Sequence, residues 1–286
     1  MVYVPDADID RLIAEDAGFG DLTTAALGIA AASGVMRFAA RHAMVACATE
    51  EAARMLARLG ARVELIARSG QAVQPGAPLL TAYGPAATLH AGWKAAQTLV
   101  EWASGIATAV AAIVAAARSE RPGIVVACTR KAVPLTRVLS IKAVHSGGGV
   151  MHRTGLSDTV LLFAEHRAFL PDLDPVALVA RLRMAAPERK LAVEVSDVAA
   201  ALAFADAGAD ILQLEKFPID SVAHVVAALG ALPHRPLVVA AGGVSAANAA
   251  AYAAAGADVL ATSAPYAAPP RDVQVAIGLS DARDTA

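Results

Sequence analysis

The chain has 286 residues, of which 57% are hydrophobic and 17% charged, so it can bury a full core in one large or two unequal domains and is not a disordered chain. Its formal net charge is -2 and no basic run stands out, which argues against nucleic acid and anionic membranes as partners. The N-terminus is acidic within six residues and does not match a secretory signal. Cys47 and Cys128 lie far apart without a CxxC pattern, so we expect a cytoplasmic protein with two small core thiols.

The first hundred residues mix helix and strand patterns. Residues 69–84 form a turn-rich hairpin pattern like that of carrier domains, but no Met-Lys pair stands at the tip. An alanine-rich helix is predicted from Pro85 to Arg118. Its longest apolar run, 105–117, has 13 residues where about 20 are needed to span a bilayer, so a buried helix is predicted. The other predicted elements are helices over 6–18 and 49–60 and strands over 34–48 and 62–68.

After Arg118, short β-branched runs alternate with alanine-rich helical segments. Apolar strands separated by helices are typical of a parallel sheet covered by helices. Gly-Ala-Asp occurs at 208–210 and 256–258, each time between a helix and a strand, where glycine commonly ends the helix. Six such units favour a barrel over an open sheet, and neither common glycine-rich nucleotide motif occurs. The predicted strands are 124–129, 159–163, 191–195, 210–215, 237–243 and 258–263.

Polar side chains follow these strands, and the carboxyl ends of barrel strands are where active sites form. Arg130 and Lys131 are adjacent cations that repel each other unless an anion lies between them. A rim salt bridge is the alternative. With His152 and Arg153 close by in sequence, we favour an anionic substrate, because arginine offers a planar fork for carboxylate or phosphate.

Glycines suggest places where backbone approaches a ligand. Residues 147–149 are three glycines that form either a flexible turn or a backbone closing around an anion. Gly242 and Gly243 are the stronger phosphate candidates, because they precede a helix predicted to begin at Ser245. Ser263, at the next strand end, would complete the cradle.

Two glutamates, Glu194 and Glu215, end apolar strands, where an unpartnered carboxylate is costly. One interpretation pairs each with Lys131 or Lys216. The other has them hold magnesium, mostly through water, against a diphosphate substrate. The two interpretations are compatible.

The stretch TRKAVPLTRVLSIKAVHSGGGVMHRTGLSD, residues 129–158, resembles the signature of the quinolinate phosphoribosyltransferase family. EDAGFGDLTT at 15–24 and SGIAT at 104–108 resemble two of its other motifs, and the resemblance covers nearly the whole chain. Within the family the chain is most similar to the ModD branch, which is associated with molybdenum transport or use. The stretches that carry this similarity are 92–97, 161–170, 212–217 and 262–270.

The resemblance implies an α/β fold made of an N-terminal α/β sandwich domain and an incomplete α/β barrel of six or seven strands, as in type II phosphoribosyltransferases. We therefore expect the sandwich at 1–108, the catalytic barrel at 109–270, and a C-terminal segment, 271–286, that returns to the N-terminal domain. The resemblance also implies a homodimer with a shared active site, small anionic substrates, and phosphoribosyl diphosphate with Mg²⁺ as donor.

Positions that match the family's motifs acquire expected roles from the resemblance. Lys131 matches the cation between donor and acceptor. Lys94 falls where the partner subunit's arginine usually sits, so the charge is kept and the planar fork is lost. The acceptor's carboxylates would be held by Arg130, His152 and Arg153, the metal and ribose by Glu194 and Glu215, and the 5′-phosphate by Gly242, Gly243, Ser263 and Ala264.

The departures from the family pattern are equally specific. Phe163 stands where the quinolinate enzymes have a lysine, so an apolar ring replaces a cation in the substrate pocket. Lys216 replaces an asparagine, Glu215 replaces an aspartate, and the glutamate before the glycine pair is lost. Quinolinate is therefore not the expected acceptor.

We expect a nucleophilic atom of an anionic, planar acceptor to displace diphosphate from ribose C1, through a transition state like an oxocarbenium ion. Three functions remain open: a ModD-type transferase with another acceptor, a true quinolinate phosphoribosyltransferase, and a non-catalytic protein that binds molybdate or a related oxyanion. The two glutamates oppose the third, because carboxylates repel an oxyanion.

Overall fold

A computed structural model describes residues 2–280, which form two compact units. The first unit contains the chain up to Ala111, residues 133–148 and the segment from Pro265 onward. The second contains residues 112–132 and 149–264. The predicted C-terminal segment thus lies partly outside the described residues.

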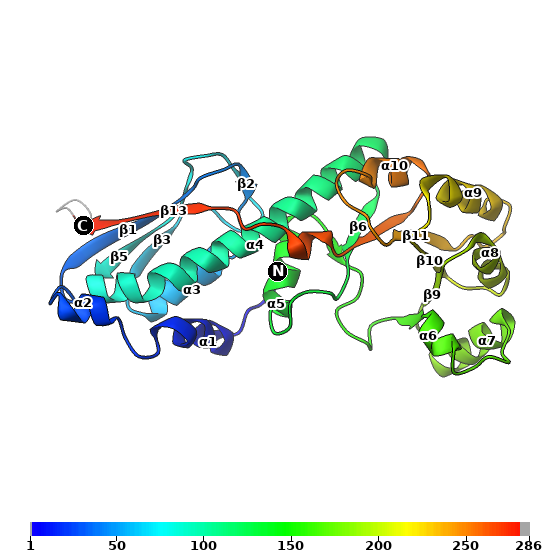
Figure 1. The fold of residues 1–286 in the computed structure, drawn as a ribbon, viewed down its shortest axis with the longest axis horizontal. Helices are drawn as coiled ribbons and strands as arrows, with labels where there is room; N and C mark the ends of the chain where they lie inside the picture. The colour runs from blue at the N-terminus through cyan, green and yellow to red at the C-terminus, as the bar shows by residue number, and fades with distance from the viewer. Residues whose placement is uncertain (1, 281–286) are drawn as a thin grey trace. The chain divides into compact units, whose positions relative to one another are not determined.

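The first unit is built on a four-stranded antiparallel sheet in the order β13-β1-β5-β3. Its strands are β1 (Ser33–Ala40), β3 (Arg62–Leu65), β5 (Pro78–Pro85) and β13 (Val273–Leu279). Figure 1 shows β13, in red, running beside β1, and their register pairs Ala40 with Val273 and Gly34 with Leu279. A short second pair joins β2 (Met44–Val45) to β4 (Ala72–Val73).

Two helices cover this sheet with apolar residues, α3 (Thr49–Arg58) and the first part of α4 (Ala86–Glu120), and α1 (Asp6–Ala17) packs on α3. The first unit also contains α2 (Leu22–Ala26) and α5 (Arg137–Ser146), described below. Asp21 caps α2 by accepting hydrogen bonds from the N–H groups of Thr23 and Thr24. The core joins Phe38 of β1, Leu56 of α3 and Leu89 of α4, all fully buried.

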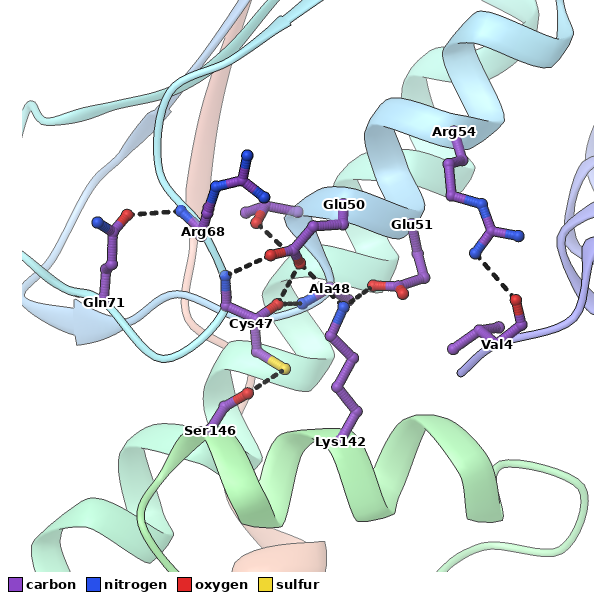
Figure 2. A network of polar contacts seen from close by, with 12 residues as sticks. Val4, Cys47, Ala48, Glu50, Glu51, Arg54, Arg68, Gln71, Lys142 and Ser146 are labelled. Carbon is purple, nitrogen blue, oxygen red and sulfur yellow. Dashed lines mark hydrogen bonds and ion pairs between the residues drawn. The ribbon is translucent and has the colours of Figure 1, made fainter. Parts of the chain in front are cut away.

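A buried charge cluster fixes α5 (Arg137–Ser146) within the first unit (Figure 2). Lys142 donates to Glu50 Oε2 at 2.9 Å and to Glu51 Oε2 at 2.5 Å. Burial opposes the charge on Glu50, but hydrogen bonds from Ser69 and Lys142 lower the pKa of Glu50 to about 2. These ion pairs hold the segment 133–148, which lies inside the range expected for the barrel domain, against α3 of the first unit.

The first of the three glycines after α5 is required by close packing. A side chain at Gly147 would place its Cβ 2.4 Å from the carbonyl oxygen of Ala107 and 2.6 Å from Val110 Cβ, both on α4. Gly148 has a φ of 81° and turns the chain out of the helix. None of residues 147–149 lines the pocket described below, so that pocket does not support the expectation that they close around an anion.

The second unit is a seven-stranded parallel sheet in the order β7-β6-β12-β11-β10-β9-β8. Its two edge strands, β7 and β8, are not paired with each other, so the barrel is incomplete. Together with the antiparallel first unit, this confirms the predicted fold class. The strands are β6 (Val125–Cys128), β7 (Val150–Met151), β8 (Val160–Leu162), β9 (Leu191–Val195), β10 (Ile211–Glu215), β11 (Leu237–Ala241) and β12 (Val259–Thr262).

Helices line the outside of this sheet in chain order (Figure 1). α8 (Val198–Asp206) packs on β9 and β10, and α10 (Ala249–Ala254) packs on β12. The remaining elements are α6 (Ala164–Arg167), α7 (Pro175–Ala185), α9 (Ile219–Leu229) and the 3₁₀ turn η1 (Ala264–Ala267). Among residues 2–280, α4 is the one helix long and apolar enough to cross a membrane, and 56% of its most apolar stretch is buried inside the protein.

Candidate active site

A pocket of about 640 Å³ opens at the carboxyl ends of the second unit's parallel strands. Parallel strands all end at the same edge of their sheet, so residues far apart in sequence meet there. Its walls include Thr129 after β6, Phe163 after β8 and Ser263 after β12. The predicted site residues that line it are Arg130, Lys131, His152, Arg153, Phe163, Glu194, Glu215, Gly242, Gly243 and Ser263.

Two predicted site residues do not line this pocket. Lys94 lies on α4 in the first unit, where its ammonium donates to Gln97 Oε1 at 3.2 Å and stands 4.2 Å from the centre of the Trp93 ring. Ala264 begins the turn η1, and its N–H donates to Thr262 Oγ1 at 3.1 Å.

One end of the pocket is cationic. Burial and the neighbouring charge of Arg130 lower the pKa of Arg153, so the two guanidinium groups are close enough to repel each other. The backbone N–H of His152 donates to the carbonyl of Cys128 at 2.9 Å, which fixes β7 beside β6. Burial, and then the charge of Arg153, lower the pKa of His152, so its imidazole is neutral at pH 7. An anion between the two arginines would relieve their repulsion.

An aromatic wall stands beside this cationic end, formed by Phe163 and His166 with the guanidinium of Arg153 over the phenyl ring. Arg153 Cζ lies 5.5 Å from the centre of the Phe163 ring. The rings of Phe163 and His166 are stacked, with centroids 5.7 Å apart and planes inclined by 26°. The N–H of Phe163 donates to His166 Nδ1 at 3.0 Å, which places the hydrogen of a neutral imidazole on Nε2.

The other end of the pocket carries two carboxylates. Burial, and then the charge of Glu215, raise the pKa of Glu194. Gln213 Nε2 donates to Glu194 Oε2 at 2.5 Å, because parallel β9 and β10 place Gln213 opposite Glu194. Among the described residues, neither glutamate forms an ion pair with Lys131 or Lys216, although the charge of Lys131 lowers the pKa of Glu194. The salt-bridge interpretation of the two glutamates is therefore not supported.

These two coupled carboxylates fit a divalent cation as part of its ligand set. They are hard oxygen donors whose mutual repulsion a cation would relieve. No group of three or more His, Cys, Asp or Glu in the described chain is arranged to hold a metal. Glu194 and Glu215 could supply two oxygen ligands to a divalent cation, and the remaining ligands would have to come from elsewhere.

The two glycines after β11 are required by their backbone conformation, and Gly242 also by close packing. Gly242 and Gly243 have φ values of 81° and 87°, which side chains rarely adopt. A Cβ on Gly242 would lie 2.5 Å from Lys216 Cγ and 2.8 Å from Glu215 Oε1. The helix predicted from Ser245 begins at Ala249, after a turn in which the N–H groups of Asn248 and Ala249 donate to the Ser245 carbonyl. The side chain of Asn248 holds this turn by accepting from the N–H of Ser245 and donating to the carbonyl of Gly243.

The lining residues that were not predicted as site residues include Glu165, His166, Gln213 and Lys216. Gln213 had a signal: it is the polar residue two positions before Glu215 on an apolar strand, so both side chains lie on one face. Lys216 could also have been predicted from sequence, because it is a cation directly after a strand. Its φ of 57° is strained for a residue with a side chain, and such strain often marks a functional position.

An incomplete parallel barrel attached to an antiparallel domain, with cations and carboxylates facing one pocket, defines a phosphoribosyltransferase, an enzyme that transfers a pentosyl group. The chain belongs to the quinolinate phosphoribosyltransferase family: the family's N-terminal domain matches residues 21–104 and its C-terminal domain residues 106–276.

Relatives and solved structures agree with this assignment. The chain is 55% identical to a protein of Rhodobacter capsulatus named "Putative pyrophosphorylase ModD" over 250 residues, which are 87% of this chain and 96% of the relative. It is 34% identical to a probable nicotinate-nucleotide pyrophosphorylase of Archaeoglobus fulgidus, over 68% of this chain and 75% of that one. The fold matches NadC from Streptococcus pyogenes with a TM-score of 0.87 and 24% identity, over 96% of this chain and 97% of that structure.

Proposed function

We propose that the protein transfers the phosphoribosyl group of phosphoribosyl diphosphate to an anionic acceptor other than quinolinate. The observation that carries the proposal is that one pocket holds both a pair of arginines, Arg130 and Arg153, and a pair of glutamates, Glu194 and Glu215. The arginine pair suits the acceptor's anionic group. The glutamate pair suits the donor's ribose and a metal ion on its diphosphate.

In this reaction, a nucleophilic atom of the acceptor forms a bond to ribose C1 as the bond from C1 to the diphosphate oxygen breaks. Diphosphate leaves with the electron pair, so positive charge develops on the ribose. Glu194 and Glu215 stabilise this charge, and Lys131 neutralises charge that moves onto the leaving group. Mg²⁺, when bound by the two glutamates, would supply further charge neutralisation for the diphosphate.

The two alternatives are less well supported. Quinolinate carries two carboxylates, and Phe163 occupies the pocket position where the quinolinate enzymes have a second-carboxylate lysine. A molybdate-binding protein without catalysis would gain nothing from two glutamates whose charges repel the ligand.

The discriminating experiment measures diphosphate release from phosphoribosyl diphosphate and Mg²⁺ with a panel of planar anionic acceptors, quinolinate and molybdate included. Release with an acceptor other than quinolinate supports the proposal. Efficient formation of nicotinate mononucleotide from quinolinate would instead identify the NAD-pathway enzyme. Molybdate binding without diphosphate release from any acceptor would favour the oxyanion-binding alternative.

Three further parts of the proposal rest on the relatives. ModD names suggest a link to molybdenum use, and the family suggests a cytoplasmic homodimer in which Lys94 serves the partner's active site. Mixing Lys94→Ala subunits with Glu194→Gln subunits tests the dimer. If the site is shared, two variants that are inactive alone regain up to about one quarter of wild-type activity, because one of the two sites in each mixed dimer is intact.

A further inference from the structure

The anionic group of the acceptor has one evident place in the pocket. Arg130 and Arg153 repel each other, and a carboxylate between them would accept hydrogen bonds from both guanidinium groups. Asp158 also attracts Arg153, but its carboxylate is engaged by the N–H and hydroxyl of Thr154 and does not line the pocket. The arginine pair therefore accounts for one anionic group.

The surface next to that place is flat and apolar. Phe163 is half-buried; its ring centre lies 5.5 Å from Arg153 Cζ and 5.7 Å from the centre of the His166 ring. An unsaturated ring gains affinity against such a surface, through aromatic contacts and through the face of a guanidinium group. A charged group placed there would lose water without gaining a partner.

The imidazoles near this place offer little to a second anionic group. Nδ1 of His166 already accepts the hydrogen bond from Phe163 N–H. Burial and the charge of Arg153 lower the pKa of His152, which disfavours its charged form. Cγ of Lys216 packs beside Gly242, on the side of the glycine pair.

We infer that the acceptor is a flat aromatic molecule with a single anionic group, held by the Arg130–Arg153 pair and packed against the wall formed by Phe163 and His166. The inference rests on the proposed function, since it names the acceptor of that reaction. Phe163 is then the residue that sets specificity: it selects against acceptors with a second carboxylate beside the first.

Two unreactive probes test this selectivity apart from catalysis. Benzoate has one carboxylate on a ring, and phthalate has two on adjacent carbons. In isothermal titration calorimetry, the wild type should bind benzoate at least tenfold more tightly than phthalate. The Phe163→Lys variant should bind phthalate at least tenfold more tightly than the wild type does, because the new ammonium pairs with the second carboxylate.

Phe169→Lys is the matched control, since Phe169 is 87% exposed and lies outside the pocket. This control should leave both affinities unchanged. If Phe163→Lys fails to fold, Phe163→Leu carries the test: it keeps an apolar wall, so the preference for benzoate persists while benzoate affinity falls severalfold with loss of the ring.

Several results would overturn the inference. The first is that the wild type binds phthalate as tightly as benzoate, and the second is that it binds neither probe. The third is that Phe163→Lys and Phe169→Lys change the phthalate affinity equally. Failure of the proposed function is seen separately, as absence of diphosphate release with every acceptor in the panel. The protein can prefer benzoate and still release no diphosphate. It can also lack this preference and still transfer phosphoribosyl to a dicarboxylate.

Discussion

Replacing Lys142 with methionine removes the cation from the buried cluster that Figure 2 shows and leaves two carboxylates facing each other. The side chain of Glu51 is 4% exposed, that of Lys142 13% and that of Glu50 26%, so solvent cannot replace the lost ion pairs. Removing one partner of a buried pair costs about 3–5 kcal/mol. A carboxylate can escape this penalty by taking up a proton, which at pH 7 costs about 3.7 kcal/mol for a glutamate of ordinary pKa. We therefore expect a loss of about 3–4 kcal/mol in the free energy of unfolding at pH 7.

The pH dependence of this loss identifies its cause. At pH 5.5, protonating an ordinary glutamate costs only about 1.6 kcal/mol, so the penalty of Lys142→Met should fall by about half. In the wild type, the pKa of Glu50 is lowered from 4.5 to about 2, so its stabilising effect is complete above pH 4.5 and is lost only as the pH falls toward 2. The wild-type contribution of Glu50 is thus constant between pH 5.5 and 7.

Tryptophan fluorescence during guanidinium unfolding is the suitable assay, because Trp93 and Trp102 both lie in the first unit with Lys142. Val144→Ala, two positions along α5, is the uncharged control: it deletes fully buried methyl groups at a cost of roughly 2 kcal/mol at either pH. Adding Glu51→Gln to Lys142→Met should recover part of the loss at pH 7. A penalty equal at both pH values, or no recovery in the double variant, would refute a charge-based origin.

Three further predictions concern the pocket. Gly242→Ala should destabilise the second unit and abolish donor binding, because the new Cβ meets Lys216 Cγ and Glu215 Oε1 at a φ of 81°. Thermal unfolding measures the first effect and donor titration the second. An unchanged melting temperature would contradict the packing argument. Glu194→Gln should raise the melting temperature at pH 7, because a carboxyl group whose pKa is raised in the folded state destabilises the fold when it is ionised. The gain should vanish as the pH falls toward 4.5. A gain that persists at pH 4.5 would show that the carboxylate charge is not its cause. The affinity for benzoate should rise as the pH falls below 6.5, the ordinary pKa of histidine. The pKa of His152 is lowered in the free protein, and a bound anion would favour its charged form. Calorimetric titrations at pH 5.5 and 7.5 measure this rise, and His152→Asn should remove it.

The alternation of strands and helices was sufficient to predict the second unit. Apolar runs such as 191–195 and 210–215 lie within a residue of the observed β9 and β10, because strands buried on both faces must be apolar throughout. The two-residue strand β7 was missed, since so short a pairing leaves no periodic pattern. The packing of 133–148 with the first unit leaves no local sequence pattern, because it depends on Lys142 meeting glutamates more than ninety positions away in sequence.

For the pocket, residues at strand ends were predictable and their partners were not. Parallel pairing brings Glu194 and Glu215 to one edge whatever the surrounding side chains are. The stacking of His166 on Phe163 depends on the turn into α6, and no sequence pattern shows which way such a turn points an imidazole. Gly147 illustrates a second limit, because a glycine serves close helix packing as readily as it serves ligand binding.

Because β13 pairs with β1, the sheet of the first unit can be completed only after the second unit has been synthesised. β1 and its neighbours emerge from the ribosome early, yet the strand that completes their sheet, and the buried Val273 that fills part of their core, come after the entire second unit. Until then β1 is an open edge able to pair with other chains. The parallel sheet can therefore fold while the N-terminal domain is still unfinished, and a chain cut short before residue 273 would present an aggregation-prone edge in place of a completed domain.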